Sequence, residues 1–166
     1  PYTTLFRSDA GGVERARAFA KLLNADLAIV DKRRPRPNEA AIMNIIGDVK
    51  GRNAIILDDM IDTGGSILDT AKQLKDKGIS KAILMVTFAL FSRGVDKFDE
   101  YYEKGLIDRV YATNAAYIPD SIASREWIKV VDCSYRLANL ISEMNYGNSI
   151  GKLINAKYET AVKVKT

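Results

Sequence analysis

The feature that most constrains the fold is the alternation of short apolar runs with amphipathic segments along most of the chain. Several of these runs are apolar throughout, which suits strands of a sheet that is buried on both faces. The segments between them repeat apolar residues at helical spacing and keep charged residues on the opposite side. The pattern predicts strands at 27–31, 54–59, 82–89, 109–114 and 128–133, and helices at 13–23, 39–46, 66–77, 95–104 and 134–144.

This alternation predicts the α/β class, with a mostly parallel, doubly wound sheet flanked by helices. At 166 residues the chain is long enough to bury one core, and no linker, repeat or low-complexity tract divides it. Ligands of such sheets bind at the carboxyl ends of the strands. We therefore expect a functional site at that edge.

Composition excludes several kinds of chemistry. The sequence contains no histidine, so these residues cannot form a Ser-His-Asp triad, a histidine metal site or a histidine general base. The single cysteine, Cys133, excludes an internal disulfide and fits a reducing compartment. A net charge of +4 is too small to argue for nucleic-acid binding, and no apolar run approaches the roughly 20 residues of a membrane span. We expect a cytoplasmic protein without nucleic-acid or membrane partners, in which Trp127 packs rather than binds a base.

The stretch AIILDDMIDTGGS, residues 54–66, predicts an anion-binding turn between a buried strand and a helix. Gly64 and Gly65 allow a tight turn and a close approach to a ligand. Backbone amides at the helix start favour an anion, and Thr63 and Ser66 add hydroxyl donors. The alternative is an ordinary glycine-rich turn in which an aspartate caps the helix.

Three carboxylates beside this turn, Asp58, Asp59 and Asp62, would repel a bare phosphate. Asp58 and Asp59 can instead accept hydrogen bonds from vicinal hydroxyls, or act through Mg²⁺. A ligand with a phosphate at one end and sugar hydroxyls nearby satisfies both halves of the stretch. Ribose 5-phosphate has this chemistry, so we expect it as the substrate.

Basic residues are concentrated in the segment DKRRPRPN, residues 31–38. Its two prolines keep the segment from being helical, as a loop that opens and closes requires. A solvated basic loop, a run that resembles a nuclear-localisation signal and an RNA contact are the alternatives that remain open for it.

These stretches carry a family resemblance. An apolar strand followed by D-D-x-x-D-T-G-G-S/T resembles the phosphoribosyl-diphosphate (PRPP) loop of the type I phosphoribosyltransferase fold. Within that superfamily, DAGGVERARAFAKLL, DKRRPRPN and GDVKGRNAIILDDMIDTGGSI occur in the order seen in ribose-phosphate diphosphokinase, also called PRPP synthetase. The resemblance runs from Asp9 to about residue 150. It implies transfer of a diphosphoryl group from MgATP to the 1-hydroxyl of ribose 5-phosphate, giving PRPP and AMP.

The resemblance also implies roles for individual residues. It places Lys32 and Arg34 in a mobile catalytic loop, where fixed cations stabilise the charge that builds on the ATP phosphates. It assigns Asp9 to Mg²⁺, although the histidine that usually shares this metal is absent from the chain. The residues implied to bind ribose 5-phosphate are Asp58, Asp59, Asp62, Thr63, Gly64, Gly65 and Ser66.

The resemblance divides the chain into three parts. Residues 1–8, PYTTLFRS, resemble the translation of a DNA sequencing adapter, so we expect a non-native leader. Residues 9–150 are expected to form the C-terminal domain of the synthetase, and residues 151–166 a weakly patterned tail. Family enzymes are nearly twice as long, take most ATP contacts from an N-terminal domain and form hexamers. We therefore expect the isolated chain to have little or no activity.

Two other functions remain open. A PRPP-consuming phosphoribosyltransferase would need a hood that recognises a base, and none is evident in the sequence. A non-catalytic regulatory subunit that associates with the synthetase would not need both Lys32 and Arg34.

Overall fold

The computed structural model describes residues 3–7, 17, 20–21, 24–33, 42–46, 49–151 and 153. The chain divides into two compact units, Pro1–Val131 and Asp132–Thr166. The first unit contains a sheet with its covering helices. In the second unit, α5 (Ser134–Asn145) is followed by a segment whose Leu153 carbonyl accepts a hydrogen bond of 2.6 Å from Arg136. Within the described ranges, none of the helices combines the length and apolarity that a membrane span requires.

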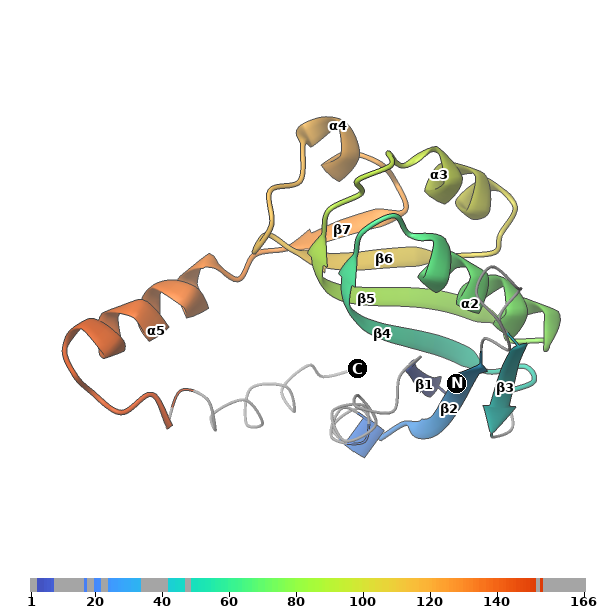
Figure 1. The fold of residues 1–166 in the computed structure, drawn as a ribbon, viewed down its shortest axis with the longest axis horizontal. Coiled ribbons are helices and arrows are strands. Elements are labelled where there is room, and N and C mark those ends of the chain that lie inside the picture. Colours follow the sequence, from blue (N-terminus) through green and yellow to red (C-terminus); the bar gives the residue numbers. More distant parts are fainter. Residues whose placement is uncertain are drawn as a thin grey trace. The chain divides into compact units, whose positions relative to one another are not determined.

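The first unit is built on a seven-stranded sheet with the order β3-β2-β1-β4-β5-β6-β7 (Figure 1). Only β2 and β3 pair in antiparallel fashion, and all other neighbouring strands are parallel. This confirms the predicted mostly parallel α/β sheet. The strands are β1 (Thr3–Arg7), β2 (Asp26–Arg33), β3 (Ile42–Ile46), β4 (Asn53–Ile61), β5 (Lys81–Ala89), β6 (Arg109–Thr113) and β7 (Ile128–Val131).

Helices α2, α3 and α4 of the first unit cover one face of this sheet (Figure 1). They span Gly65–Asp76, Asp96–Glu103 and Asp120–Ala123. The helices predicted at 66–77, 95–104 and 134–144 are confirmed, whereas the single turn of α4 is too short to show helical periodicity in the sequence. Of the helix predicted at 13–23, the described residues 17, 20 and 21 are helical, and the others lie outside the described part.

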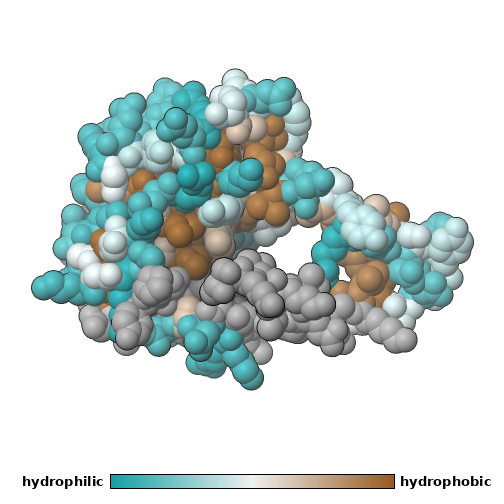
Figure 2. Space-filling model, turned by 180° about the vertical axis from the view of Figure 1, so that it is seen from behind, coloured by the Kyte–Doolittle hydropathy of each residue, from teal (hydrophilic) through white to brown (hydrophobic). Residues whose placement is uncertain are grey.

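The main core lies between the sheet and these helices. It takes apolar side chains from β4, β5 and β6, from α2, and from the large aromatic residues Phe98 and Trp127. A smaller cluster joins Ile55 and Leu57 of β4 to Ala20, which lies outside the sheet. Half-buried Ile83 and Met85 pack against this second cluster. Figure 2 shows hydrophobic residues at the surface on one side of the molecule.

The prediction of a helix over 39–46 is wrong. Residues Ile42–Ile46 form β3, which pairs with the end of β2 so that Arg33 lies opposite Ile42. Isoleucine is β-branched, a shape that loses rotamer freedom in a helix and packs well on a pleated sheet. Pairing with β2 satisfies the backbone of this short segment, which local periodicity could not reveal.

Two further differences concern β1 and β2. The segment expected to be a basic loop over 31–38 begins as a strand, because β2 extends through Arg33; residues 34–38 lie outside the described part. The sequence did not predict β1, yet Thr3–Arg7 lies between β2 and β4 and is parallel to both. Its backbone completes the hydrogen-bond ladder between those strands even though its residues lack an apolar pattern. The non-native origin of residues 1–8 stays a prediction.

Candidate functional site

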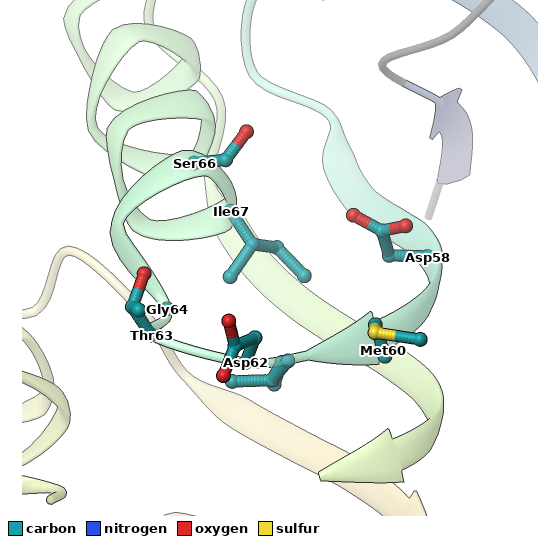
Figure 3. A pocket seen from close by; sticks show the side chains of 8 residues that line it. Asp58, Met60, Asp62, Thr63, Gly64, Ser66 and Ile67 are labelled. Atoms are coloured by element: carbon teal, nitrogen blue, oxygen red, sulfur yellow. The ribbon is translucent and has the colours of Figure 1, made fainter. Parts of the chain in front are cut away.

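A pocket of about 150 Å³ lies where β4 ends and α2 begins (Figure 3). In this view, the Asp58 carboxylate on β4 and the Ser66 hydroxyl on α2 lie on opposite sides of Ile67. The pocket is at the carboxyl edge of the parallel strands, where α/β sheets bind their ligands. Its lining residues are Asp58, Met60, Ile61, Asp62, Thr63, Gly64, Ser66 and Ile67.

The turn that enters α2 is formed around Gly64. This residue is the N-cap of the helix and has a left-handed backbone with φ of 81°. As a glycine, this N-cap residue has no side chain that could cap the helix, and no acidic residue lies in the first turn of α2. A helix start of this kind presents backbone N–H groups and a partial positive charge, which together favour an anionic ligand.

Glycine is required at position 64 for a second reason. A Cβ atom placed there would lie 2.5 Å from Cε2 of Phe98, closer than carbon atoms can approach. The Phe98 side chain is 1% exposed, so the ring cannot move aside into solvent. The turn therefore requires glycine at position 64, because the buried Phe98 ring occupies the space that a side chain there would need.

Strand geometry separates the two neighbouring carboxylates. Successive residues of a strand tend to point to opposite faces, and here Asp58 and Met60 line the pocket while Asp59 between them does not. Asp58 lines the pocket and accepts a hydrogen bond of 2.9 Å from the backbone N–H of Asp59. Asp62 lies at the end of the strand, and its carbonyl accepts a hydrogen bond of 3.0 Å from the N–H of Ser92.

The pocket therefore brings together most of the residues that the sequence points to for ribose 5-phosphate. Asp59 and Gly65 do not line it. Met60, Ile61 and Ile67 line it without having been predicted. The position of Met60 could have been inferred from strand alternation with Asp58, whereas Ile67 looked like a core residue of the helix. The predicted residues that line the pocket are Asp58, Asp62, Thr63, Gly64 and Ser66.

The structure describes one of the three predicted catalytic and metal-binding residues. Lys32 lies in β2, with its backbone opposite Met43 of β3. Arg34 and Asp9 lie outside the described residues. In the part of the chain that the structure describes, no three histidine, cysteine, aspartate or glutamate side chains gather as a metal-binding group.

Comparisons with known proteins show which families this chain is similar to. Residues 31–155 match the family model of the phosphoribosyl synthetase-associated domain. Over 148 residues the chain is 41% identical to a ribose-phosphate pyrophosphokinase of Chromobacterium violaceum, covering 89% of this chain and 44% of that protein.

Solved structures agree with the sequence match. Phosphoribosylpyrophosphate synthetase from Mycobacterium smegmatis superposes with a TM-score of 0.73 at 27% identity, covering 88% of this chain and 46% of that one. Adenine phosphoribosyltransferase from Trypanosoma brucei, solved with AMP, pyrophosphate and ribose-5-phosphate, gives a TM-score of 0.52 at 18% identity over 80% of this chain and 56% of that one. At that identity the second match shows the fold alone, which is the type I phosphoribosyltransferase fold expected from the sequence.

The family match includes the turn at Gly64, the carboxylates of β4 and the basic end of β2. The chain spans about half the length of the synthetases that it resembles. Fold, motifs and sequence similarity thus agree, and the chain belongs to the phosphoribosyl synthetase-associated domain family, with ribose-phosphate pyrophosphokinases as its relatives.

Proposed function

We propose that this chain provides the ribose 5-phosphate site and the catalytic basic segment of a ribose-phosphate pyrophosphokinase. The reaction transfers a diphosphoryl group from MgATP to the 1-hydroxyl of ribose 5-phosphate, giving PRPP and AMP. One observation carries the proposal: a single pocket joins the start of α2 at Gly64 to the carboxylates of Asp58 and Asp62. The names of the relatives support the same activity.

In the proposed complex the two ends of the substrate meet different groups. The phosphate accepts hydrogen bonds from backbone amides at the start of α2 and from the hydroxyls of Thr63 and Ser66. The ribose hydroxyls donate to the carboxylates of Asp58 and Asp62, which carry the negative charge that a phosphate would avoid. Asp59 keeps its predicted role as a further sugar contact, which its own variant tests.

Mg²⁺ fits the oxygen groups of this pocket. It is commonly held by one or two carboxylates together with substrate phosphates and water, and Asp58 with Asp62 matches that demand. Asp9 is the further ligand that the family resemblance predicts. When bound, the ion would neutralise part of the charge on the phosphates.

The proposed chemistry requires cations near the transferring phosphates. The ribose 1-hydroxyl oxygen forms a bond to the β-phosphorus of ATP and gives up its proton to water, and the bond from that phosphorus to the bridging oxygen of AMP breaks. Negative charge shifts to the leaving oxygen during this step, so fixed cations lower the barrier. Lys32 and Arg34 are the residues proposed to supply them.

Calorimetric titration of ribose 5-phosphate with Mg²⁺ tests the binding site, using the wild-type chain beside Asp58→Asn and Asp59→Asn. We expect weak binding that Asp58→Asn reduces at least about 10-fold, because hydrogen bonds to a charged group contribute about 1.5–3 kcal/mol. Asp59→Asn should reduce it less, since Asp59 does not line the pocket. Equal binding by the wild type and Asp58→Asn would contradict the sugar contact.

A second measurement tests the catalytic proposal. We expect little or no PRPP synthesis by the isolated chain, because the relatives are about twice as long. In a protein that does synthesise PRPP, Lys32→Ala should lower turnover and leave ribose 5-phosphate binding unchanged. Synthesis by the isolated chain at the rate of a complete synthetase would contradict the proposed division of labour.

The family description, a synthetase-associated domain, favours one alternative, a non-catalytic subunit that binds a synthetase. Under this alternative the chain would co-purify with an active synthetase, and Lys32→Ala would leave the activity of the complex unchanged. A PRPP-consuming transferase would instead release diphosphate from PRPP only when a base is added.

A further inference from the structure

We infer that an aromatic cluster formed by Phe91, Phe98 and Trp127 positions the anion-binding turn, with Phe98 as the residue that holds Gly64 in place. None of these side chains lines the pocket. The ligand in this inference is the one of the proposed function, on which the inference rests. Phe98 is a positioning residue, because it acts on the ligand through the backbone of the turn.

The Phe98 ring lies directly against Gly64. The ring atoms Cε2 and Cζ lie 2.5 Å and 2.6 Å from the place that a Cβ of Gly64 would occupy. The ring edge therefore fills the space of the missing side chain. A turn that relaxed toward the ring would collide with it, so the contact limits the backbone of Gly64 from one side.

The ring is itself held by its neighbours. Phe98 stacks on Trp127 with ring centres 5.4 Å apart, and Phe91 meets Phe98 edge-on at 5.1 Å. Phe91 also meets Trp127 edge-on at 5.9 Å. Stacked and edge-to-face arrangements are the favoured geometries for aromatic pairs, and close packing leaves a buried ring little room to move.

Polar contacts fix the far side of the cluster. The indole N–H of Trp127 donates a hydrogen bond of 2.6 Å to Oδ1 of Asp99, and Arg125 forms an ion pair with the other carboxylate oxygen. Asp99 follows Phe98 in α3, so the same short helix carries the ring and its anchor. The indole is thereby held in one orientation beneath the Phe98 ring.

The backbone connects the cluster to the turn a second time. The N–H of Leu90 donates to the carbonyl of Ile61 at 2.8 Å, and the N–H of Ser92 donates to that of Asp62 at 3.0 Å. Phe91 lies between these donors with a φ of 48°, a region that residues other than glycine rarely adopt. Its side chain is only 6% exposed, and such conformations persist where packing holds them.

The turn is thus held at the carbonyls of Ile61 and Asp62 and again at Gly64. An anion site made of backbone amides depends on their direction, because a bound ligand otherwise has to order them first. Removing the Phe98 ring should release the backbone of Gly64 without replacing any residue that lines the pocket. The expected consequence is weaker binding of ribose 5-phosphate by a protein that is still folded.

The test compares Phe98→Leu with Leu74→Ala, a matched core substitution. Leu74 is fully buried on α2, the helix that begins at the turn, but lies near the C-terminal end of that helix. Backbone amide NMR resonances of Gly64, Gly65 and Ser66 report the turn in the free protein, and calorimetry with ribose 5-phosphate and Mg²⁺ reports its function. We expect Phe98→Leu to shift these resonances and raise the Kd about 10-fold, well within what misplaced groups cost. Leu74→Ala should lower Tm while leaving the resonances and the Kd within about 2-fold of wild type.

The outcomes are separable. If wild type fails to bind ribose 5-phosphate, the proposed function fails, while the amide resonances still decide whether Phe98 positions the turn. If Phe98→Leu and Leu74→Ala give the same resonances and the same Kd, the positioning role is overturned. Should Phe98→Leu not fold, Asp99→Asn keeps the ring and removes the charge that holds Arg125; a Kd unchanged by this variant would overturn the role of the anchor.

Discussion

Two strand-to-helix connections at the same edge of the sheet are built in similar ways and face different surroundings. The β4–α2 connection contains Gly64 with φ of 81°, and the β5–α3 connection contains Gly94 with φ of 77°. A Cβ atom at Gly64 would collide with Phe98, whereas one at Gly94 would meet nothing within 4 Å. The first connection lines the pocket, and the second donates hydrogen bonds to the first.

The two connections share a glycine with a left-handed backbone and differ in what packs against it. A left-handed glycine makes both connections possible, since the sharp turn requires a φ that other residues rarely adopt. Hydrogen bonds join the two connections, but a buried ring lies against the glycine in the first and not in the second. One connection thus lines the pocket, and the next supports it through hydrogen bonds.

The largest expected effect comes from Gly64→Ala compared with Gly94→Ala. Both variants add a side chain at a positive φ, but Gly64→Ala also places a Cβ atom against the buried Phe98 ring. We expect a loss of about 2–4 kcal/mol in the free energy of unfolding for Gly64→Ala and about 1 kcal/mol for Gly94→Ala, measured by urea denaturation. Equal losses would mean that the ring contact carries no energy.

Trp127→Phe tests how much the hydrogen bond between Trp127 and Asp99 stabilises the protein, separately from the packing of the aromatic rings. The variant keeps an aromatic ring and removes the N–H that Asp99 accepts at 2.6 Å. A lost hydrogen bond to a charged, partly buried group costs about 1.5–3 kcal/mol. Thermal unfolding should therefore show a lower Tm, and Trp127→Leu, which removes the aromatic ring as well, should lower it further. A Tm equal to that of wild type would contradict the role of this hydrogen bond.

Asp108→Asn tests the edge of the sheet opposite the pocket, where we expect an effect on stability and none on ligand binding. The Asp108 carboxylate accepts hydrogen bonds from the Ala82 N–H at 2.7 Å and from Lys75 at 3.2 Å. We expect a loss of about 1 kcal/mol in the free energy of unfolding, because one hydrogen bond and one ion pair weaken. The Kd for ribose 5-phosphate should not change. A weaker Kd would show that the two edges of the sheet are coupled.

The smallest effect concerns pH and the Tyr101 hydroxyl of α3. Burial raises the pKa of Tyr101, and the nearby charges of Asp69 and Glu100 raise it further. The unfolded chain then loses this proton first, near pH 10, so the contribution of Tyr101 to stability is present below that pH and is lost as pH rises toward the folded pKa. Urea denaturation between pH 9 and 11 should show a shallower decline for Tyr101→Phe than for wild type. Equal declines would contradict this linkage.

The sequence predicted the regular part of this molecule well. The strands at β4 to β7 and helices α2, α3 and α5 follow from apolar runs and helical periodicity, which local segments carry within themselves. The turn at Gly64 follows from its glycines and its place between a buried strand and a helix. The packing of Trp127 was also expected and is confirmed by its 2% exposure.

Other features depend on partners that are distant along the chain. The segment Ile42–Ile46 is a strand because β2 lies beside it, and β1 is a strand because β2 and β4 flank it. Neither pairing leaves a local pattern that a helix or a loop could not share. The roles predicted for Lys32, Arg34 and Asp9 come from the family resemblance and remain predictions.

The sequence by itself determined the α/β class, the family and the position of the anion-binding turn, because each of these is carried by contiguous residues whose chemistry and spacing are sufficient. Tertiary structure alone decided that Asp58 lines the pocket while Asp59 does not, and that the Phe98 ring lies against Gly64. The physical reason is that the alternation along a strand is local, but which residues meet α2 and which ring lies against Gly64 are settled only when segments far apart in sequence pack together.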